Sequence, residues 1–522
     1  MKNIYLLLIL SLVPILLQAQ FKPESDKEIL PNQSAWLSLQ MSKNDVTRYS
    51  ELVPDTNKTT FPAVSKSTSP DSIKYNMYGD LRDDNPKYNP RRSIWRPIES
   101  IVMTNIVTNI FDHYVLGATY THVGFASWGR NLKAGIPSGA GWEWDQDRFG
   151  MNFFMHPYSG SAFFNAARAN GYNFWESSPF ALFGSYMWKI FGETGVPERN
   201  DLIMTTVNGI YLGEIFYRLG SNILDDQTTG ANRFFRELAV AVISPTRFFS
   251  RLMNGYLTRS TSEEVYQKEP LNITLATGYH RVNEGTVIQN GGSNSVYFNM
   301  MLDYGNPFEK RTRKPYEYFK LVADVDFGVG RKIVDNIVGY GILTGSNVQT
   351  GNMEMLVGLF QHMNLFDNKT FELGTISFGP GIISKLPMTK YISLYTSAFV
   401  DIVPFGGLSK RFGPDTTQRR DYNYVGGLEG KFESTLNIGW VGFSVAAYYW
   451  WLHTYVGEPG DSYVALVKPK ITFRIFNNIS FGVEHQIYYT DRYPTAFAPV
   501  HQVRTEERVF VQIFLEEFKF KR

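Results

Sequence analysis

The second half of the chain, from about residue 271 onward, alternates apolar and polar residues with a period of two. In one stretch, Val296, Phe298 and Met300 interleave with Tyr297 and Asn299. This period places the two sets on opposite faces of a β-strand. One face is rich in aliphatic and aromatic groups, and the other carries charged groups. The polar face of a soluble sandwich contacts bulk water, whereas that of a transmembrane barrel lines the lumen.

The alternation predicts about twelve strands, within a range of ten to fourteen, and many are long enough to cross a bilayer at a tilt. The expected ranges are 271–281, 294–305, 316–329, 334–344, 353–363, 370–383, 390–403, 422–433, 437–452, 462–476, 478–489 and 505–520. An even number of strands closes a sheet and removes its edges. We therefore predict a membrane all-β barrel of antiparallel transmembrane strands over residues 259–522. The aromatic stretch Phe518–Phe520 would close the barrel against the first strand.

The first strand illustrates the expected facing of the side chains. We expect four residues to face lipid, namely Leu271, Ile273, Leu275 and Tyr279. We expect three residues to face inward, namely Asn272, Thr274 and His280.

Residues 91–258 change to helical spacing and form an α-rich block. The expected helices cover 94–115, 161–169, 181–191, 201–223 and 232–253, the last interrupted by Pro245. No apolar run in this block reaches the length of a clean spanning helix. Since a barrel of this size is wide enough to hold a helical plug, we expect the block to plug or cap it, and the alternative is a periplasmic domain under the barrel.

The N-terminus predicts export. A short basic start and an apolar run from Ile4 to Leu17 are typical of a secretory signal peptide over residues 1–20. Residues 21–90 are polar and aperiodic, which indicates a flexible periplasmic segment. The chain has no cysteine, which excludes disulfides, thiolate metal sites and a lipoprotein anchor. We expect a cell outer membrane protein.

Composition supports the barrel over its alternative, an aromatic-rich secreted β-sandwich. Aromatic residues make up 15% of the chain, with 39 Phe and 31 Tyr, as in barrels with aromatic girdles at both membrane interfaces. The net charge of +2 argues against nucleic acid as a partner. We expect a monomeric barrel whose partner is an outer-membrane lipid or lipopolysaccharide.

The densest group of chemically active residues lies between Trp142 and Gly171. It contains Asn152, and its possible catalytic members are Asp145, Asp147, His156, Ser159 and Ser161. A helix that begins near Ser159 would direct free N–H groups toward His156 and create an anion or oxyanion site, with Arg168 about two turns further on. The pattern is not specific for catalysis, because no nucleophile elbow of the G-x-S-x-G type is present.

A second group follows in residues 201–218. Glu214 and Arg218 are four apart on one helix and can pair. With the first group they predict a network that either binds a ligand or is structural, consisting of Asn152, His156, Arg168, Glu176, Glu193, Asp201, Glu214 and Arg218. Four glycines are expected to allow close packing, namely Gly160, Gly171, Gly209 and Gly213.

These motifs resemble domain-of-unknown-function family 3943, over about residues 80–225. The resemblance rests on Asn152-x3-His156-Pro157-x2-Gly160, on Ala167-Arg168-x2-Gly171, on Asp201-Leu202-Ile203 and on Gly209-x3-Gly213-Glu214. It implies an outer-envelope location in gram-negative bacteria and no particular activity.

Three functions remain open. The first is binding or passage of an envelope lipid or glycan through a partly plugged lumen, where the ligand meets His156 and Arg168. The second is a lipid hydrolase or acyl-transfer enzyme, with His156 as base, Ser159 or Ser161 as nucleophile and an aspartate as orienting group. The third is a scaffold in envelope assembly. No H-x3-H spacing occurs, so we expect no cofactor and no metal, with His156 beside Asp145 or Asp147 as the weak alternative.

Overall fold

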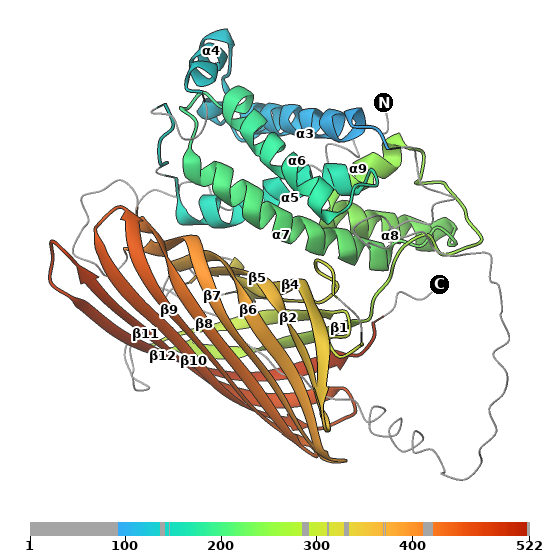
Figure 1. Ribbon diagram of the computed structural model, residues 1–522, viewed down its shortest axis with the longest axis vertical. Coiled ribbons are helices and arrows are strands. Elements are labelled where there is room, and N and C mark those ends of the chain that lie inside the picture. Colours follow the sequence, from blue (N-terminus) through green and yellow to red (C-terminus); the bar gives the residue numbers. More distant parts are fainter. Residues whose placement is uncertain are drawn as a thin grey trace.

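The computed structural model describes residues 92–135, 141–145, 147–283, 292–310, 313–327, 334–368, 370, 372–410 and 421–518. The expected signal peptide and the expected periplasmic segment therefore lie outside the described residues. The described chain forms a helical block followed by a sheet of long strands (Figure 1).

The helical block contains seven α-helices and three shorter helical turns among the described residues. They are α3 (Trp95–Tyr114), η1 (Thr119–Thr121), α4 (Phe125–Lys133), η2 (Met151–Met155), α5 (His156–Arg168), α6 (Phe174–Met187), η3 (Trp188–Gly192), α7 (Arg199–Ile223), α8 (Gly230–Ile243) and α9 (Pro245–Met253). Each expected helix has a counterpart, and Pro245 separates α8 from α9 as predicted. The pattern did not predict α4. Among the described residues, we find no helix that combines the length and the apolar character needed to cross a membrane.

Twelve antiparallel strands form a closed barrel, which confirms the predicted fold class and strand number. They are β1 (Leu271–Val282), β2 (Ser293–Tyr304), β3 (Phe319–Asp326), β4 (Val334–Thr350), β5 (Met353–Asp367), β6 (Glu372–Thr389), β7 (Ile392–Ser409), β8 (Tyr422–Ile438), β9 (Val441–Val456), β10 (Gly460–Arg474), β11 (Ile479–Pro494) and β12 (Val500–Leu515). The barrel closes where β12 pairs with β1, from Ile273 opposite Leu515 to Val282 opposite Glu506. The Phe518 N–H also donates a backbone hydrogen bond of 2.7 Å to the Leu271 carbonyl. Lys519 and Phe520 lie outside the described residues.

The lumen is filled by side chains from opposite walls. Lys320 on β3 lies 3.6 Å from Glu433 on β8, and Asn364 on β5 donates to Glu429 on β8 at 2.9 Å. Since these strands are not neighbours in the barrel, the contacts cross the lumen. Trp450 and Arg508 are also buried, at 0% and 1% exposure. Side chains that lined an open water-filled pore would be accessible, so the lumen is occluded at this level.

The outer wall is apolar and exposed over much of the barrel. Val400 and Ile402 on β7 are 68% and 63% exposed, and Val511 on β12 is 46% exposed. Strands of up to 18 residues are longer than the 9 to 11 that a bilayer crossing requires. A closed barrel with an apolar exterior and a polar interior is the architecture of outer-membrane proteins. The fold therefore confirms the expected location in the cell outer membrane.

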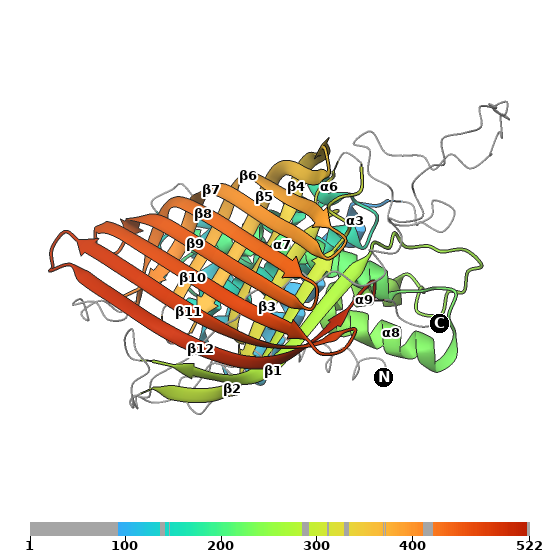
Figure 2. The same ribbon diagram turned by 90° about the horizontal axis from the view of Figure 1, so that it is seen from below.

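The helical block lies against the outer wall of the barrel, on β1 to β8 (Figures 1 and 2). Tyr211 on α7 packs at Gly339 on β4, where an added Cβ would lie 2.6 Å from the tyrosine oxygen. In the same way, Phe153 of η2 packs on Gly374 of β6 and on Gly407 of β7. These glycines share the face of the sheet that is opposite to Asn364 and the other lumen residues. This position corrects the expected plug or cap, because wall side chains already fill the lumen and flat glycine patches receive the helices outside.

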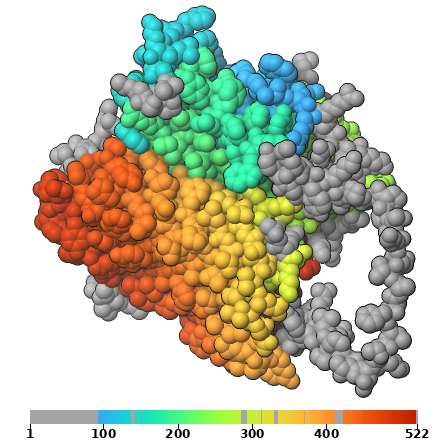
Figure 3. All heavy atoms as spheres, in the orientation of Figure 1, coloured from blue at the N-terminus to red at the C-terminus, as the bar shows by residue number. Residues whose placement is uncertain are grey.

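The first strand follows the predicted alternation with one correction. Thr274 and His280 are buried inside, and Tyr279 is exposed on the outer face. Leu271 is buried in a cluster with residues of the helical block, and Ile273 packs against that cluster, so these two do not form a bare lipid-facing surface. The space-filling view shows the block covering one flank of the barrel (Figure 3).

Candidate functional site

The motif around His156 lies in one continuous helical segment. The π-turn η2 runs directly into α5, and the His156 N–H donates to the Met151 carbonyl five residues earlier. Pro157 follows at the start of α5, where its missing N–H is tolerated. The expected helix start near Ser159, with free N–H groups beside His156, is therefore wrong. Those N–H groups lie inside a helix that begins earlier, and the anion site inferred from them is absent from the described residues.

His156 belongs to a buried charge network between α5, η3 and α7. Its Nε2 lies 3.2 Å from Asp201 Oδ2, and the same carboxylate also contacts Lys189 Nζ. Lys189 further contacts Glu193 and Glu198, each at 2.7 Å. Burial lowers the pKa of His156, but the adjacent Asp201 carboxylate outweighs it and raises the pKa to about 9. The protonated form of His156 is therefore favoured at neutral pH.

The other groups of the His156 network also have shifted pKa values. Burial opposes ionisation of Asp201, but the charges of His156 and Lys189 prevail and hold its pKa below the usual range. Burial lowers the pKa of Lys189, yet its three acidic neighbours raise it well above the usual range. Burial raises the pKa of Glu198, because one ammonium group shared among three carboxylates does not fully compensate it. The network thus contains three carboxyl groups and two cationic groups, and burial favours the neutral form of Glu198.

Asp145 joins this network to the barrel wall. Its carboxylate accepts from Asn152 Nδ2 at 2.9 Å and from the Tyr424 hydroxyl of β8 at 2.6 Å. Asn152 Nδ2 also donates to the Tyr422 hydroxyl at 2.6 Å, and Asn152 Oδ1 accepts from Asn200 at 3.0 Å. The first half of the motif therefore attaches the helical block to the outer face of the sheet.

Asp147 lies close to the same group but is exposed. One ligand atom from each of Asp145, Asp147 and His156 lies within 4.8 Å of the other two. Among the described residues, these three form the group that could hold a metal ion.

Arg168 lies in a second network, apart from His156. Its Nε and Nη2 donate to Glu214 at 2.7 and 2.9 Å, in a two-pronged contact. Arg218 Nε donates to the same carboxylate at 2.9 Å, as its four-residue spacing predicts. The Arg168 guanidinium also stacks on the Tyr217 ring at 4.2 Å. The structure therefore places Arg168 in a buried interaction between α5 and α7, and not beside His156 as a ligand clamp.

Two predicted network residues remain. Glu176 lies at the start of α6, and Glu193 lies at the end of η3. Glu176 caps the start of α6 with Asn173 and pairs with Arg92 at 3.0 Å. Glu193 follows η3 and pairs with Lys189. Glu193 therefore belongs to the His156 network, and Glu176 does not.

Three of the four glycines occupy tight contacts, and Gly171 has another role. A Cβ at Gly160 would lie 1.7 Å from the Thr205 carbonyl oxygen, and a Cβ at Gly213 would lie 2.7 Å from Phe164. Gly209 faces Gly160 across the same helix pair. Gly171 ends α5 with φ +84°, a conformation that glycine adopts without strain, and has open space around its Cβ position apart from Arg92 at 3.9 Å.

The two serines differ in their surroundings. Ser161 donates to the Tyr158 carbonyl at 2.6 Å within its own helix. Ser159 lines a cavity that His156 also lines. A serine hydrolase needs a neutral histidine that accepts the serine proton. The raised pKa of His156 favours its protonated form, which cannot accept that proton.

The cavity of about 360 Å³ lies between α3, α5, η3 and α9. Its charged lining residues besides His156 are Asp112, Asp147, Lys189, Glu193 and Glu198, and most of them belong to the His156 network or lie beside it. The other lining residues are mainly apolar, and they include Met103, Val107, Phe163, Phe248 and Phe249. Burial raises the pKa of Asp112 to about 7, despite a hydrogen bond from Tyr120. The cavity is therefore amphipathic.

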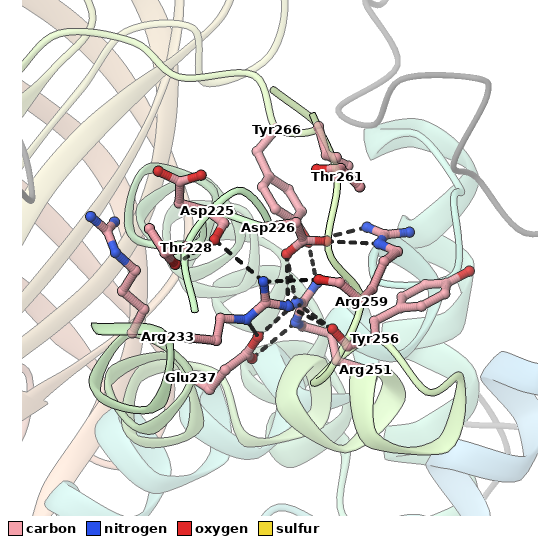
Figure 4. A network of polar contacts seen from close by, with 12 residues as sticks. Asp225, Asp226, Thr228, Arg233, Glu237, Arg251, Tyr256, Arg259, Thr261 and Tyr266 are labelled. Carbon is pink, nitrogen blue, oxygen red and sulfur yellow. Dashed lines mark hydrogen bonds and ion pairs between the residues drawn. The ribbon is translucent and has the colours of Figure 1, made fainter. Parts of the chain in front are cut away.

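Sequence reasoning missed a third network, at the C-terminal end of the block (Figure 4). Asp226 contacts Arg233, Arg251 and Arg259 at 3.0, 2.9 and 2.7 Å. Glu237 contacts Arg233 at 2.8 Å and Arg251 at 2.7 Å. The four-residue spacing of Arg233 and Glu237 was the visible signal. The other members come from separate elements, and their donors are occupied by protein groups, so the network fixes α8 and α9 to the segment before β1.

Comparison with known proteins confirms the family resemblance. Residues 141–246 match a family described as "Domain of unknown function (DUF3943)". This range starts and ends later than the expected 80–225, and it covers η2 through α8. None of the curated proteins compared with the chain matches it.

Solved outer-membrane porins are similar to part of the chain. The NanC porin is 9% identical over 47% of this chain and 98% of its own, with a TM-score of 0.26. The outer membrane channel DcaP of Acinetobacter baumannii is 6% identical over 47% and 96%, with a TM-score of 0.23. The anion-selective porin from Comamonas acidovorans is 9% identical over 47% and 98%, with a TM-score of 0.22.

Proposed function

We propose that the protein binds an envelope lipid, an outer-membrane lipid or lipopolysaccharide, in the cavity between α3, α5, η3 and α9. The amphipathic cavity carries this proposal. Its volume of about 360 Å³ is within the range of small-molecule pockets, about 300–1,000 Å³. Apolar lining residues suit an acyl chain, and the charged lining residues suit a polar head group.

The surroundings of the cavity support access from a membrane. Met103 lines the cavity and is also 42% exposed on the outer face of α3. Ile106 and Ile110 continue that exposed apolar face. Large apolar residues are also exposed on α8, where Phe234 and Phe235 lie side by side in sequence. Contiguous exposed apolar surface marks an interaction site, and an acyl chain could pass along α3 into the cavity.

The alternatives have less support. Passage through the barrel would require an open lumen, and side chains such as Trp450 and Arg508 are buried there. Acyl transfer would require a neutral His156, which its pKa of about 9 disfavours. The scaffold alternative rests on residues 21–90, which lie outside the described residues. We therefore retain a monomeric barrel with a lipid as partner.

Lipid analysis of the purified full-length protein tests the proposal. We expect mass spectrometry to detect a co-purifying envelope lipid with the unmodified chain. Ala162 lines the cavity, so Ala162→Trp should fill it and reduce the recovered lipid about tenfold or more. Ala126→Trp is the matched control, because Ala126 is exposed on α4, and it should retain the lipid. Equal lipid recovery from both variants, or no specific lipid with the unmodified chain, would contradict the proposal.

A further inference from the structure

We propose that Asp145, Asp147 and His156 form a binding site for a divalent cation of the Zn²⁺ type. The structure gathers one ligand atom from each residue within 4.8 Å of the other two. Ligand atoms around a tetrahedral zinc ion lie about 3.4 Å apart. A modest inward movement therefore completes the site, and the exposed side chain of Asp147 is free to make it.

Two of the three ligands are already held in position. Asp145 accepts hydrogen bonds from Asn152 at 2.9 Å and from Tyr424 at 2.6 Å. His156 has the Asp201 carboxylate 3.2 Å from its Nε2. Metal-binding histidines commonly pair with a carboxylate, and metal-binding carboxylates accept further hydrogen bonds. The surroundings of Asp145 and His156 match that arrangement, and zinc binding would release the proton that the raised pKa of His156 favours.

The local charge also favours a cation. Lys189 is the ammonium group of this network, and its contacts are with Glu193, Glu198 and Asp201. The carboxylates of Asp145 and Asp147 lie beside this network, each with an oxygen within 4.8 Å of a His156 ring nitrogen. A divalent cation at the proposed site would offset these two carboxylates.

The identity of the donor atoms selects the class of ion. Mg²⁺ and Ca²⁺ take oxygen ligands, whereas an imidazole suits Zn²⁺ and related ions. Catalytic zinc sites typically have three protein ligands and keep a fourth position open for water or a ligand. Asp147 and His156 both line the cavity, so the fourth position would face it. A head-group phosphate could then reach the ion, but the site itself does not depend on lipid binding.

Titration of the purified full-length protein with Zn²⁺ alone tests this proposal. The parent should carry His122→Gln, because the His113 and His122 rings lie 4.3 Å apart on the surface and could also bind zinc. We expect one zinc ion to bind this parent at the site, and Asp147→Asn to weaken its binding about tenfold or more. Glu143→Gln is the matched control, because Glu143 is exposed in the same segment, and it should bind zinc as the parent does.

Two further measurements make the result decisive. Helical circular dichroism shows whether Asp147→Asn folds, and His156→Gln should reproduce its loss of zinc. Equal zinc affinity in a folded Asp147→Asn protein, or no zinc binding by the parent, overturns the proposal. Lipid recovery from the same preparations reports on the proposed function separately, since zinc is titrated without added lipid.

Discussion

Gly160 on α5 and Gly209 on α7 face each other so closely that a Cβ added at Gly209 would lie 2.6 Å from the Gly160 Cα. The two helix backbones are therefore in direct contact at this point. The contact lies next to the His156 network, so it fixes how α5 and α7 present their charged residues to each other. The addition of one methyl group at Gly209 tests how much this contact contributes to stability.

Gly209→Ala should destabilise the helical block. The added methyl meets backbone atoms that cannot move aside, and overpacking of this kind costs about 1–3 kcal/mol. Urea unfolding followed by helical circular dichroism reports on the block, because the barrel contributes little helix. Gly129→Ala on α4 is the control, since nothing lies within 4 Å of its Cβ position. It should keep or raise stability by up to about 1 kcal/mol. Equal stability of the two variants would exclude a tight glycine contact.

Arg168→Met should also destabilise the block, because it leaves the buried Glu214 with one arginine instead of two. Breaking a buried ion pair costs about 3–5 kcal/mol, and the remaining Arg218 should keep the loss near the lower value. Arg92→Met removes a pair with Glu176 in which both side chains are about a third exposed, so the cost should be under about 1 kcal/mol. The same urea experiment compares them. A smaller loss for Arg168→Met than for Arg92→Met would contradict the buried role.

The stability of the helical block should fall as the pH rises from about 4 to 9. Folding raises the pKa of Asp112 from 3.8 to about 7 through burial, and that of His156 from 6.5 to about 9 through Asp201. A raised pKa means that the folded chain binds the proton more tightly. The resulting stabilisation is complete below the unfolded pKa and is lost as the pH passes the folded pKa.

Asp112→Asn separates the two groups in this pH dependence. The variant should show a weaker decline between about pH 4 and 7, where Asp145 and Glu198 with their raised pKa values still contribute, and keep the part between about pH 7 and 9. Urea unfolding at pH 5, 7 and 9 measures both parts. An unchanged profile in the variant would show that Asp112 does not hold its proton in the folded block.

The filled lumen predicts that the purified barrel does not conduct ions as an open porin does. Trp450 and Tyr448 are buried in the lumen at 0% and 2% exposure, and Lys320 reaches Glu433 across it. Single-channel recording in planar bilayers should show no steady conductance. Trp450→Ala removes the largest of these side chains and should increase brief openings. Steady, large conductance by the unmodified chain would show that the lumen opens under those conditions.

The barrel was predictable because its signal is local. Each strand carries its own period-two pattern, so the twelve ranges followed from sequence alone, and closure followed from the need to remove edges. The side of the wall against which the helices pack was not predictable. It depends on Gly339, Gly374 and Gly407, which leave flat patches on the outer face, and single glycines in strands usually suggest bulges or bends.

The sequence predicted most residues of the site, but it predicted their spatial arrangement only in part. His156, Asp145, Asn152 and Asp201 do meet, as their shared motif suggested. The helix start was misplaced because Pro157 is typical of a first turn, whereas the π-turn before it has no 3.6-residue pattern. The partner of Arg168 was ambiguous, since several acidic residues could reach it and only the helix packing selects Glu214.

The bonds from Asn152 to Tyr422 and from Tyr424 to Asp145 join residues 270 and 279 positions apart in the chain. The helical block is synthesised first, but the surface that receives it includes β8 and cannot exist until most of the barrel has been made. Contacts of such sequence separation form late, since the intervening chain must first be ordered. The helical block therefore cannot dock before its surface on the barrel has formed. The His156 site is completed only after the barrel has assembled.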